Sequence, residues 1–412
     1  MTLRRYAWML IFTAAAPMFA QDQWPQFHGP RRDNVSTETN LLAKWPARGP
    51  KLLWAKRGVG AGYATVAISG GKIYTAGNAD DQTIITALGL DGKILWRAPN
   101  GPIAGRSYPG ARGTPTVCGG KVYHLAPDGA AICLDAETGK PVWSLNVLEK
   151  FKGESCKWGL SESLLIDNGN VICTVGGRKT SIVALDAKSG KTVWESPGTG
   201  EKPGYASPIV VEHRGLRQIV TSMSKSIVSV AADSGRILWR FEHVVPLDAN
   251  IMTPIHNDGL IFISAGGKGG TLLKLRVSGN KCGVKVAWRN PKFDNAHGGV
   301  VLHKGYLYGH SEGSSRITCV EFKSGKTAYW VKHEAAGKKS AAITLAGGML
   351  YILGDDKTVW LAKPDPKAFE PISSFKILPG GRGPSWAHPV VFGGRLYIRH
   401  DRMLLAYDIA AK

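Results

Sequence analysis

Side chains able to bind a ligand or transfer a proton stand just ahead of short β-branched runs along the whole chain. They are Tyr63, Arg112, Trp158 with Glu162, Tyr205, Asn250, His297, Lys339, and Trp386 with His388. Aromatic faces, imidazoles and cations that converge on one opening are typical of a ligand pocket, and a neutral imidazole there could accept a proton. The same residues could instead cap the opening and hydrogen-bond to the backbone as packing groups. Either interpretation requires a fold that brings these positions together.

Six cysteines, at positions 118, 133, 156, 173, 282 and 319, raise the question of disulfides or a metal site. None is adjacent to another, and no two cysteines or histidines have ligand spacing. Cys133 and Cys319 take a position that holds Ala184 and Ser229 elsewhere, which indicates small buried side chains. Cys118 and Cys133 belong on non-neighbouring strands, too far apart for a bridge. We expect mostly free thiols and no metal centre.

An internal repeat specifies the elements that position these residues. Cys133-Leu-Asp-Ala-Glu-Thr-Gly-Lys-Pro-Val-Trp143 and Ala184-Leu-Asp-Ala-Lys-Ser-Gly-Lys-Thr-Val-Trp194 share one frame. Its last position falls at Trp54, Trp96, Trp143, Trp194, Trp239, Trp288, Trp330 and Phe375. A period of about 45 residues is typical of a β-propeller blade. We expect these tryptophans to pack blade against blade, and aspartates 135, 186 and 408 to hydrogen-bond within turns.

The second full repeat predicts the four strands of a blade, at 114–118, 121–125, 130–135 and 141–145, with Gly-rich turns between them. The chain opens with a lone outer-strand signature at 50–54 and ends with strand-like runs at 387–392, 395–399 and 404–409. Pairing the two ends completes an eighth blade and removes exposed strand edges. The predicted fold is all-β: an eight-bladed propeller of four-stranded antiparallel blades over residues 50–412, preceded by an extended lead-in at 21–49.

Residues 1–20 have the layout of an export signal. Arg4 and Arg5 precede an apolar stretch at 6–19, and Ala20 offers a cleavage point before Gln21. That stretch is short for a membrane span, and no other segment approaches one. The net charge of +21 comes from scattered lysines and arginines, which indicates a basic surface more than a polyanion site. We expect a periplasmic or secreted monomer that has no membrane span and does not bind nucleic acid.

The Ala-x-Asp-x-x-(Ser/Thr)-Gly-Lys-x-x-Trp frame resembles the Trp-docking repeat of the pyrroloquinoline-quinone (PQQ) repeat propellers over about residues 50–412. That family includes PQQ-dependent dehydrogenases and the non-enzymatic propeller lipoprotein of the outer-membrane β-barrel assembly machine. The opening Trp24-Pro-Gln-Phe-His-Gly-Pro-Arg-Arg-Asp-Asn also resembles exported PQQ-like proteins that lack an assigned activity. The chain departs from the dehydrogenases because it has no vicinal Cys-Cys pair and no convincing Asp constellation.

The resemblance implies two functions, and the departures favour the first. The first is a non-catalytic binding or scaffold propeller in the cell envelope, which holds a protein, a glycan or a small ligand at the residues named above. The second is a PQQ-dependent alcohol or sugar dehydrogenase, with Glu162 and Asn250 as candidates to bind Ca²⁺. In that enzyme His297 or His388 would act as base, and Arg112 would suit the carboxylates of the quinone.

Overall fold

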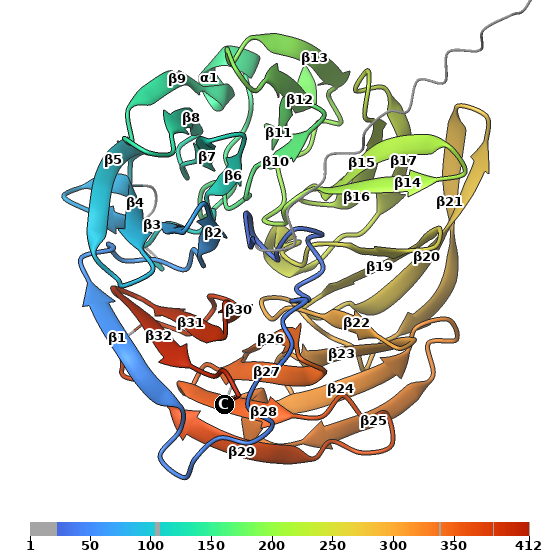
Figure 1. Cartoon of the computed structure of the whole chain (residues 1–412). Coiled ribbons are helices and arrows are strands. Elements are labelled where there is room, and N and C mark those ends of the chain that lie inside the picture. Colours follow the sequence, from blue (N-terminus) through green and yellow to red (C-terminus); the bar gives the residue numbers. More distant parts are fainter. Residues whose placement is uncertain (1–22, 104–107, 338, 382, 412) are drawn as a thin grey trace, which may run out of the picture.

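The protein is a ring of eight four-stranded antiparallel sheets around a central channel (Figure 1), as expected from the repeat. The computed structural model describes residues 23–103, 108–337, 339–381 and 383–411. The predicted export signal, at residues 1–20, lies outside them. Within the described residues no helix is long and apolar enough to cross a membrane.

Each sheet is one blade, and in the first seven blades the strands run in chain order from the channel to the rim. The first four blades comprise β2 (Ala67–Ser69), β3 (Lys72–Ala79), β4 (Gln82–Gly89), β5 (Ile94–Pro102); β6 (Thr116–Cys118), β7 (Lys121–Leu125), β8 (Ala130–Asp135), β9 (Pro141–Asn146); β10 (Leu165–Asp167), β11 (Asn170–Thr174), β12 (Thr180–Asp186), β13 (Thr192–Pro197); and β14 (Ile209–His213), β15 (Leu216–Ser222), β16 (Ser226–Ala231), β17 (Ile237–Glu242).

The next three blades comprise β18 (Ile255–Asn257), β19 (Leu260–Ala265), β20 (Gly269–Ser278), β21 (Lys281–Asn290); β22 (Val301–His303), β23 (Tyr306–Ser311), β24 (Arg316–Glu321), β25 (Thr327–Lys332); and β26 (Ala341–Ala346), β27 (Met349–Gly354), β28 (Thr358–Ala362), β29 (Pro371–Lys376). The helical segments described are short: α1 (Val147–Phe151), η1 (Pro246–Asp248) and η2 (Glu334–Ala336).

The eighth blade joins the two ends of the chain, as predicted. Its strands β30 (Val390–Phe392), β31 (Arg395–His400) and β32 (Met403–Asp408) come from the C-terminal end, and β1 (Lys51–Arg57) supplies the rim strand. β1 pairs antiparallel with β32 from Lys51 opposite Asp408 to Arg57 opposite Met403. The ring is therefore closed by hydrogen bonds between strands more than three hundred residues apart.

Tryptophans of the repeat pack each blade onto the next. Trp96 on β5 donates its indole N–H to the carbonyl of Ala136 in the second blade, and Trp143 donates to Ala187 in the third. The ring of Trp96 lies against Gly139, whose φ of +69° and missing Cβ leave room for the indole. The aliphatic core consists of clusters between adjacent blades, such as the one that joins the third and fourth through Trp194. The predicted packing role of the repeat tryptophans is confirmed at these blades.

The sixth blade departs from the predicted frame. Cys319 lies opposite Tyr329, in the register that places Cys133 opposite Trp143. Tyr329 is buried in the core with the seventh blade, whereas Trp330 lies one position further along and contacts the guanidinium of Arg316 at 4.0 Å. The comparison of repeats assigned Trp330 to the last position of the frame because the other repeats have tryptophan there. In the structure, Tyr329 occupies that position and packs between the blades.

The six cysteines are unpaired, and all lie among the described residues. Cys118 is on β6 and Cys133 on β8, which are separated by β7, so the expected separation holds. Cys133 and Cys319 are fully buried in the cores between blades, where a small side chain fits.

The lead-in crosses the central channel instead of lying on the outside of the ring. In Figure 1 the darkest blue segment runs from the C-terminal blades into the middle of the ring. Trp24 bridges to Ile68 of the first blade, Val35 to Leu345 of the seventh and Leu41 to Ala410 after the eighth. Trp24 and Val35 therefore contact the two blades that flank the eighth, whereas Arg32 between them donates to backbone oxygens ahead of the third and fourth blades, across the channel.

Candidate ligand pocket at the channel mouth

A cavity of about 330 Å³ lies at the mouth of the channel. Its walls are the segments that lead into the inner strands of seven blades, together with the lead-in. Seven of the ten residues named from the sequence line it: Tyr63, Arg112, Trp158, Tyr205, His297, Trp386 and His388. Its volume falls in the range that holds small ligands. The fold thus brings together most of a set that is spread over more than three hundred positions of sequence.

The floor of the cavity is made by the lead-in. Phe27 stacks on His28 with ring centroids 3.8 Å apart, and both residues line the cavity. His28 Nε2 lies 2.8 Å from His388 Nδ1, and His388 Nε2 lies 3.1 Å from the backbone oxygen of His297. Because that oxygen only accepts, His388 donates from Nε2 and accepts at Nδ1 from His28. This chain of hydrogen bonds joins the lead-in to the eighth and sixth blades.

His28 and His388 are both neutral at pH 7. Burial lowers the pKa of His388 to about 4. Burial also lowers the pKa of His28 well below its usual value, and repulsion from a protonated His388 and from the charge of Arg32 lowers it further. Protonation of His388 at Nδ1 would place a second proton between the two facing nitrogen atoms. Hence the pairing that fixes the floor requires a neutral His388.

Arg32 holds the lead-in from beneath the cavity. Its Nη1 donates to the backbone oxygens of Ser163 and Pro208 at 3.0 Å each, and its Nη2 donates to that of Leu164 at 2.5 Å. Its Nε donates to Gln26 Oε1 at 2.9 Å. Burial lowers the pKa of Arg32 to about 10, so the guanidinium stays charged at neutral pH. One side chain of the lead-in therefore binds the third and fourth blades together.

Aromatic rings form most of one wall. Trp386 stacks on His297 with centroids 4.4 Å apart and planes inclined by 13°. Tyr63 and Tyr108 lie on the same indole at 5.0 and 5.2 Å. Trp158 and Tyr205 form a second pair, at 5.6 Å. Flat, rigid faces of this kind favour a flat or apolar ligand.

Arg112 adds a positive charge between the two aromatic pairs. Its Nη1 donates to the backbone oxygen of Trp158 at 2.9 Å, its Nη2 donates to that of Tyr108 at 2.7 Å, and its guanidinium lies 5.8 Å from the ring of Tyr63. Burial lowers its pKa, but the side chain remains a cation at neutral pH. Among the described residues that line the cavity there is no carboxylate, so Arg32 and Arg112 leave it positively charged.

Glu162 does not face the cavity, contrary to the prediction. Its two carboxylate oxygens accept the backbone N–H of Thr174 on β11 at 3.1 and 3.2 Å, and only 4% of the residue is exposed. Burial raises the pKa of Glu162 to about 7, against the hydrogen bonds from Thr174 and the charge of Arg32. Its position just ahead of an inner strand placed the backbone at the mouth, but the side chain turns into the blade.

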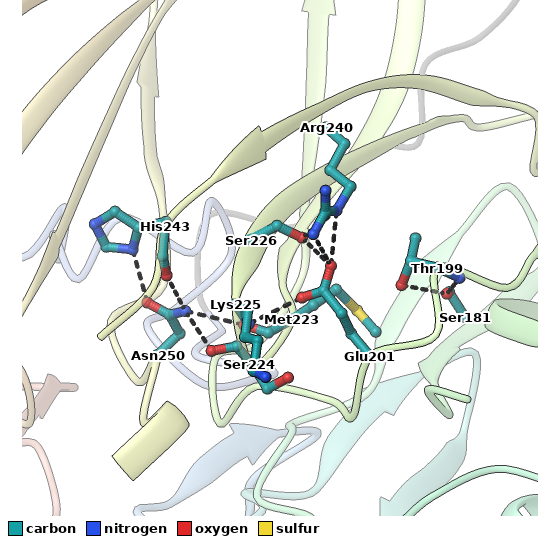
Figure 2. A network of polar contacts seen from close by, with 10 residues as sticks. All are labelled: Ser181, Thr199, Glu201, Met223, Ser224, Lys225, Ser226, Arg240, His243 and Asn250. Atoms are coloured by element: carbon teal, nitrogen blue, oxygen red, sulfur yellow. Dashed lines mark hydrogen bonds and ion pairs between the residues drawn. The ribbon is translucent and has the colours of Figure 1, made fainter. Parts of the chain in front are cut away.

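Asn250 does not line the cavity. Figure 2 shows its side-chain amide bonded to His243 and to the backbone around Ser224. Its Oδ1 lies 2.8 Å from His243 Nδ1, and its Nδ2 donates to the backbone oxygens of Met223, Ser224 and His243. The amide thus holds the segment before β18 against the fourth blade. Lys339, noted at the corresponding place in the seventh blade, does not line the cavity either.

Glu162 and Asn250, which were predicted to bind Ca²⁺, are not placed to coordinate this ion. Ca²⁺ needs six to eight oxygen ligands, several of them carboxylates. The oxygens of Glu162 and Asn250 are engaged with the blades, and the described lining supplies no other carboxylate. Within the described residues no group of three His, Cys, Asp or Glu could hold a metal ion. The donor set at this mouth is not that of a calcium quinoprotein.

Four residues important to the site were missed from the sequence: Phe27, His28 and Arg32 of the lead-in, and Glu312. Glu312 accepts a hydrogen bond from His297 Nδ1 and another from its backbone N–H, the latter at 3.1 Å. It follows β23, and the loop between the second and third strands of a blade opens at the same mouth as the segment before the first strand. A search of those loops would have found Glu312, since His310-Ser-Glu312 ends a buried strand.

Comparison with known proteins gives one family. Residues 80–331, more than half of the chain, match the model of the family described as outer membrane protein assembly factor BamB. The protein of that name from Burkholderia pseudomallei is 26% identical over 189 residues, which are 46% of this chain and 44% of that protein. The polyvinylalcohol dehydrogenase of a Sphingopyxis species is 22% identical over 84% of this chain and 68% of its own length. The match thus spans less than half of the first of these relatives.

Solved structures of both kinds share the fold. BamB from Moraxella catarrhalis has a TM-score of 0.63 at 14% identity, over 88% of this chain and 98% of that one. A europium-containing methanol dehydrogenase has a TM-score of 0.65 at 14% identity, over 92% of this chain and 89% of that one. At such identities the likeness concerns the propeller alone, and function has to be argued from the site.

Proposed function

This chain belongs to the family described as outer membrane protein assembly factor BamB, and we propose that it is a non-catalytic, ligand-binding propeller of the cell envelope. The observation that carries the proposal is the aromatic cavity at the channel mouth, with its floor supplied by the lead-in. An envelope location is supported by the name of the family and by the layout of residues 1–20.

The ligand that suits the cavity is small, ring-bearing, and neutral or anionic. Indole and phenol faces from Trp386, Tyr63 and Tyr205 offer stacking surfaces, and about 330 Å³ holds one or two fused rings with substituents. The charges of Arg32 and Arg112 oppose a cationic ligand because the described lining carries no carboxylate. The dehydrogenase alternative is disfavoured because the oxygen ligands for Ca²⁺ are engaged elsewhere.

The test is binding of a neutral ring compound, para-bromoanisole, measured by calorimetry and by quenching of tryptophan fluorescence. We expect saturable binding by the wild-type protein. Trp386→Ala should weaken it by about fivefold or more, since an aromatic contact contributes about 1 kcal/mol beyond its buried area.

Trp330→Ala serves as the matched control, because Trp330 lies on the rim strand β25, outside the cavity. It should leave the affinity unchanged. Absence of saturable binding to the folded wild-type protein, or equal losses in the two variants, would contradict the proposal.

A further inference from the structure

The imidazole of His297 has one nitrogen fixed by the protein and one open to the cavity. Nδ1 is hydrogen-bonded to Glu312 Oε1, and Glu312 Oε2 accepts the backbone N–H of His297 at 3.1 Å. Nε2 has no hydrogen-bond partner among the described residues, and it is not one of the buried unpartnered nitrogen atoms. Since His297 lines the cavity with 29% of its side chain exposed, Nε2 meets the cavity space.

Glu312 decides which nitrogen of the neutral ring carries the proton. Burial raises the pKa of Glu312, but the hydrogen bonds and charge of His297 outweigh burial and leave that pKa below its usual value. An ionised carboxylate can only accept, so the hydrogen atom lies on Nδ1. A neutral imidazole whose proton lies on Nδ1 keeps its lone pair on Nε2. In that form His297 is an acceptor toward the cavity.

Trp386 fixes the plane of that acceptor. The indole lies parallel to the imidazole, 4.4 Å away, so the ring cannot tilt without losing the stack. Glu312 prevents a flip of the ring, because a flip would break the bond at Nδ1. The neighbouring His388 does not compete for Nε2, as its own Nε2–H donates to the backbone oxygen of His297. A preorganised acceptor of this kind, with no protein donor, is suited to a donor on the ligand.

We propose that His297 Nε2 accepts a hydrogen bond from a hydroxyl group on the ligand ring, so that the cavity selects hydroxylated ring compounds of the phenol class. This inference rests on the proposed function and names the ligand class for the same site. His297 is the binding residue, and Glu312 is a positioning residue that acts through it. A phenol stays un-ionised at neutral pH, so it brings the missing donor without bringing a charge.

The experiment compares para-bromophenol with para-bromoanisole, which differ only in the methyl group that replaces the hydroxyl hydrogen. Affinities are measured by calorimetry at neutral pH on the full folded chain. Wild-type protein should prefer the phenol by about tenfold, the scale of a hydrogen bond between a donor and a well-placed, charge-supported acceptor. Binding of the anisole alone tests the proposed function; the ratio of the two affinities tests this inference.

Two variants distinguish a hydrogen bond to His297 Nε2 from exclusion of the methyl group by the shape of the cavity. His297→Phe keeps a ring to stack on Trp386 but has no Nε2, so the ratio should fall to about one while the anisole still binds. Glu312→Gln keeps an acceptor for Nδ1–H without the charge, so it should lower the ratio to an intermediate value. The unfolding midpoints of both variants verify that the propeller is folded.

Three results would overturn the inference. One is a wild-type ratio near one while the anisole binds. Another is a preference for the phenol that persists in His297→Phe, because the methyl group would then be excluded by shape. The third is a Glu312→Gln variant whose ratio equals that of the wild type, since Glu312 would then have no part in presenting Nε2.

Discussion

Replacing Arg32 by methionine removes the hydrogen bonds that hold the lead-in in the channel while keeping a side chain of similar length. The guanidinium is fully buried and donates to three backbone oxygens of the ring and to Gln26. Hydrogen bonds to a charged group contribute about 1.5–3 kcal/mol each, offset by the cost of burying the charge. Loss of one partner of such a buried network costs about 3–5 kcal/mol. We expect the free energy of unfolding to fall by that amount.

Arg31→Met is the matched control because it removes the same charge from the neighbouring position. Arg31 is exposed, and its ion pair with Asp33 leaves half of its side chain in solvent. Such a pair contributes at most about 1 kcal/mol. Urea unfolding followed by tryptophan fluorescence measures both variants, and hydrogen exchange on residues 24–36 shows whether the lead-in undocks before the ring unfolds. Equal effects of the two variants, or a loss below about 1 kcal/mol for Arg32→Met with full protection of 24–36, would refute this reasoning.

Three further predictions concern stability. The pKa of His388 is about 4 in the folded protein and 6.5 in an exposed histidine. The contribution of the neutral His388 ring to the free energy of unfolding is therefore complete above pH 6.5. Up to about 3 kcal/mol is lost as the pH falls from 6.5 to 4; urea unfolding at several pH values measures this, and His388→Gln should flatten the profile. Gly139→Ala should destabilise the protein by about 2 kcal/mol more than Gly119→Ala in urea melts. Both positions need positive φ, but only at Gly139 would the new Cβ lie 2.6 Å from an indole carbon. Tyr329→Ala should cost about 3–5 kcal/mol and Trp330→Ala about 1 kcal/mol in thermal melts, as only Tyr329 fills the core between blades.

The sequence predicted the ring well because a blade is encoded locally. Short glycine turns join neighbouring strands of a blade, as Gly119 and Gly120 join β6 to β7. The frame Ala184 to Trp194 sets the register of β12 on β13, and its repetition sets the period. The frame failed at Tyr329, where one extra residue moved the matching tryptophan out of the docking position.

The site was less predictable because its contacts join distant parts of the chain. Backbone positions ahead of the inner strands predicted which segments meet at the mouth, but the direction of the Glu162 and Asn250 side chains depends on acceptors and donors in neighbouring strands. The pairing of His28 with His388 spans 360 positions. No local pattern marks a segment that will enter a channel, so the floor of the cavity could be known only once the ring was built.

The most direct test of the account is a crystal structure of the protein soaked with para-bromoanisole, with data collected at the bromine absorption edge. The anomalous signal locates the ligand without assumptions about its orientation. We expect one dominant bromine peak inside the channel-mouth cavity, between the Trp386 stack and the pair of Trp158 and Tyr205, above Phe27 of the lead-in. A cavity without bromine, in crystals that carry the peak elsewhere on the ring, would contradict the claim that this mouth is the binding site.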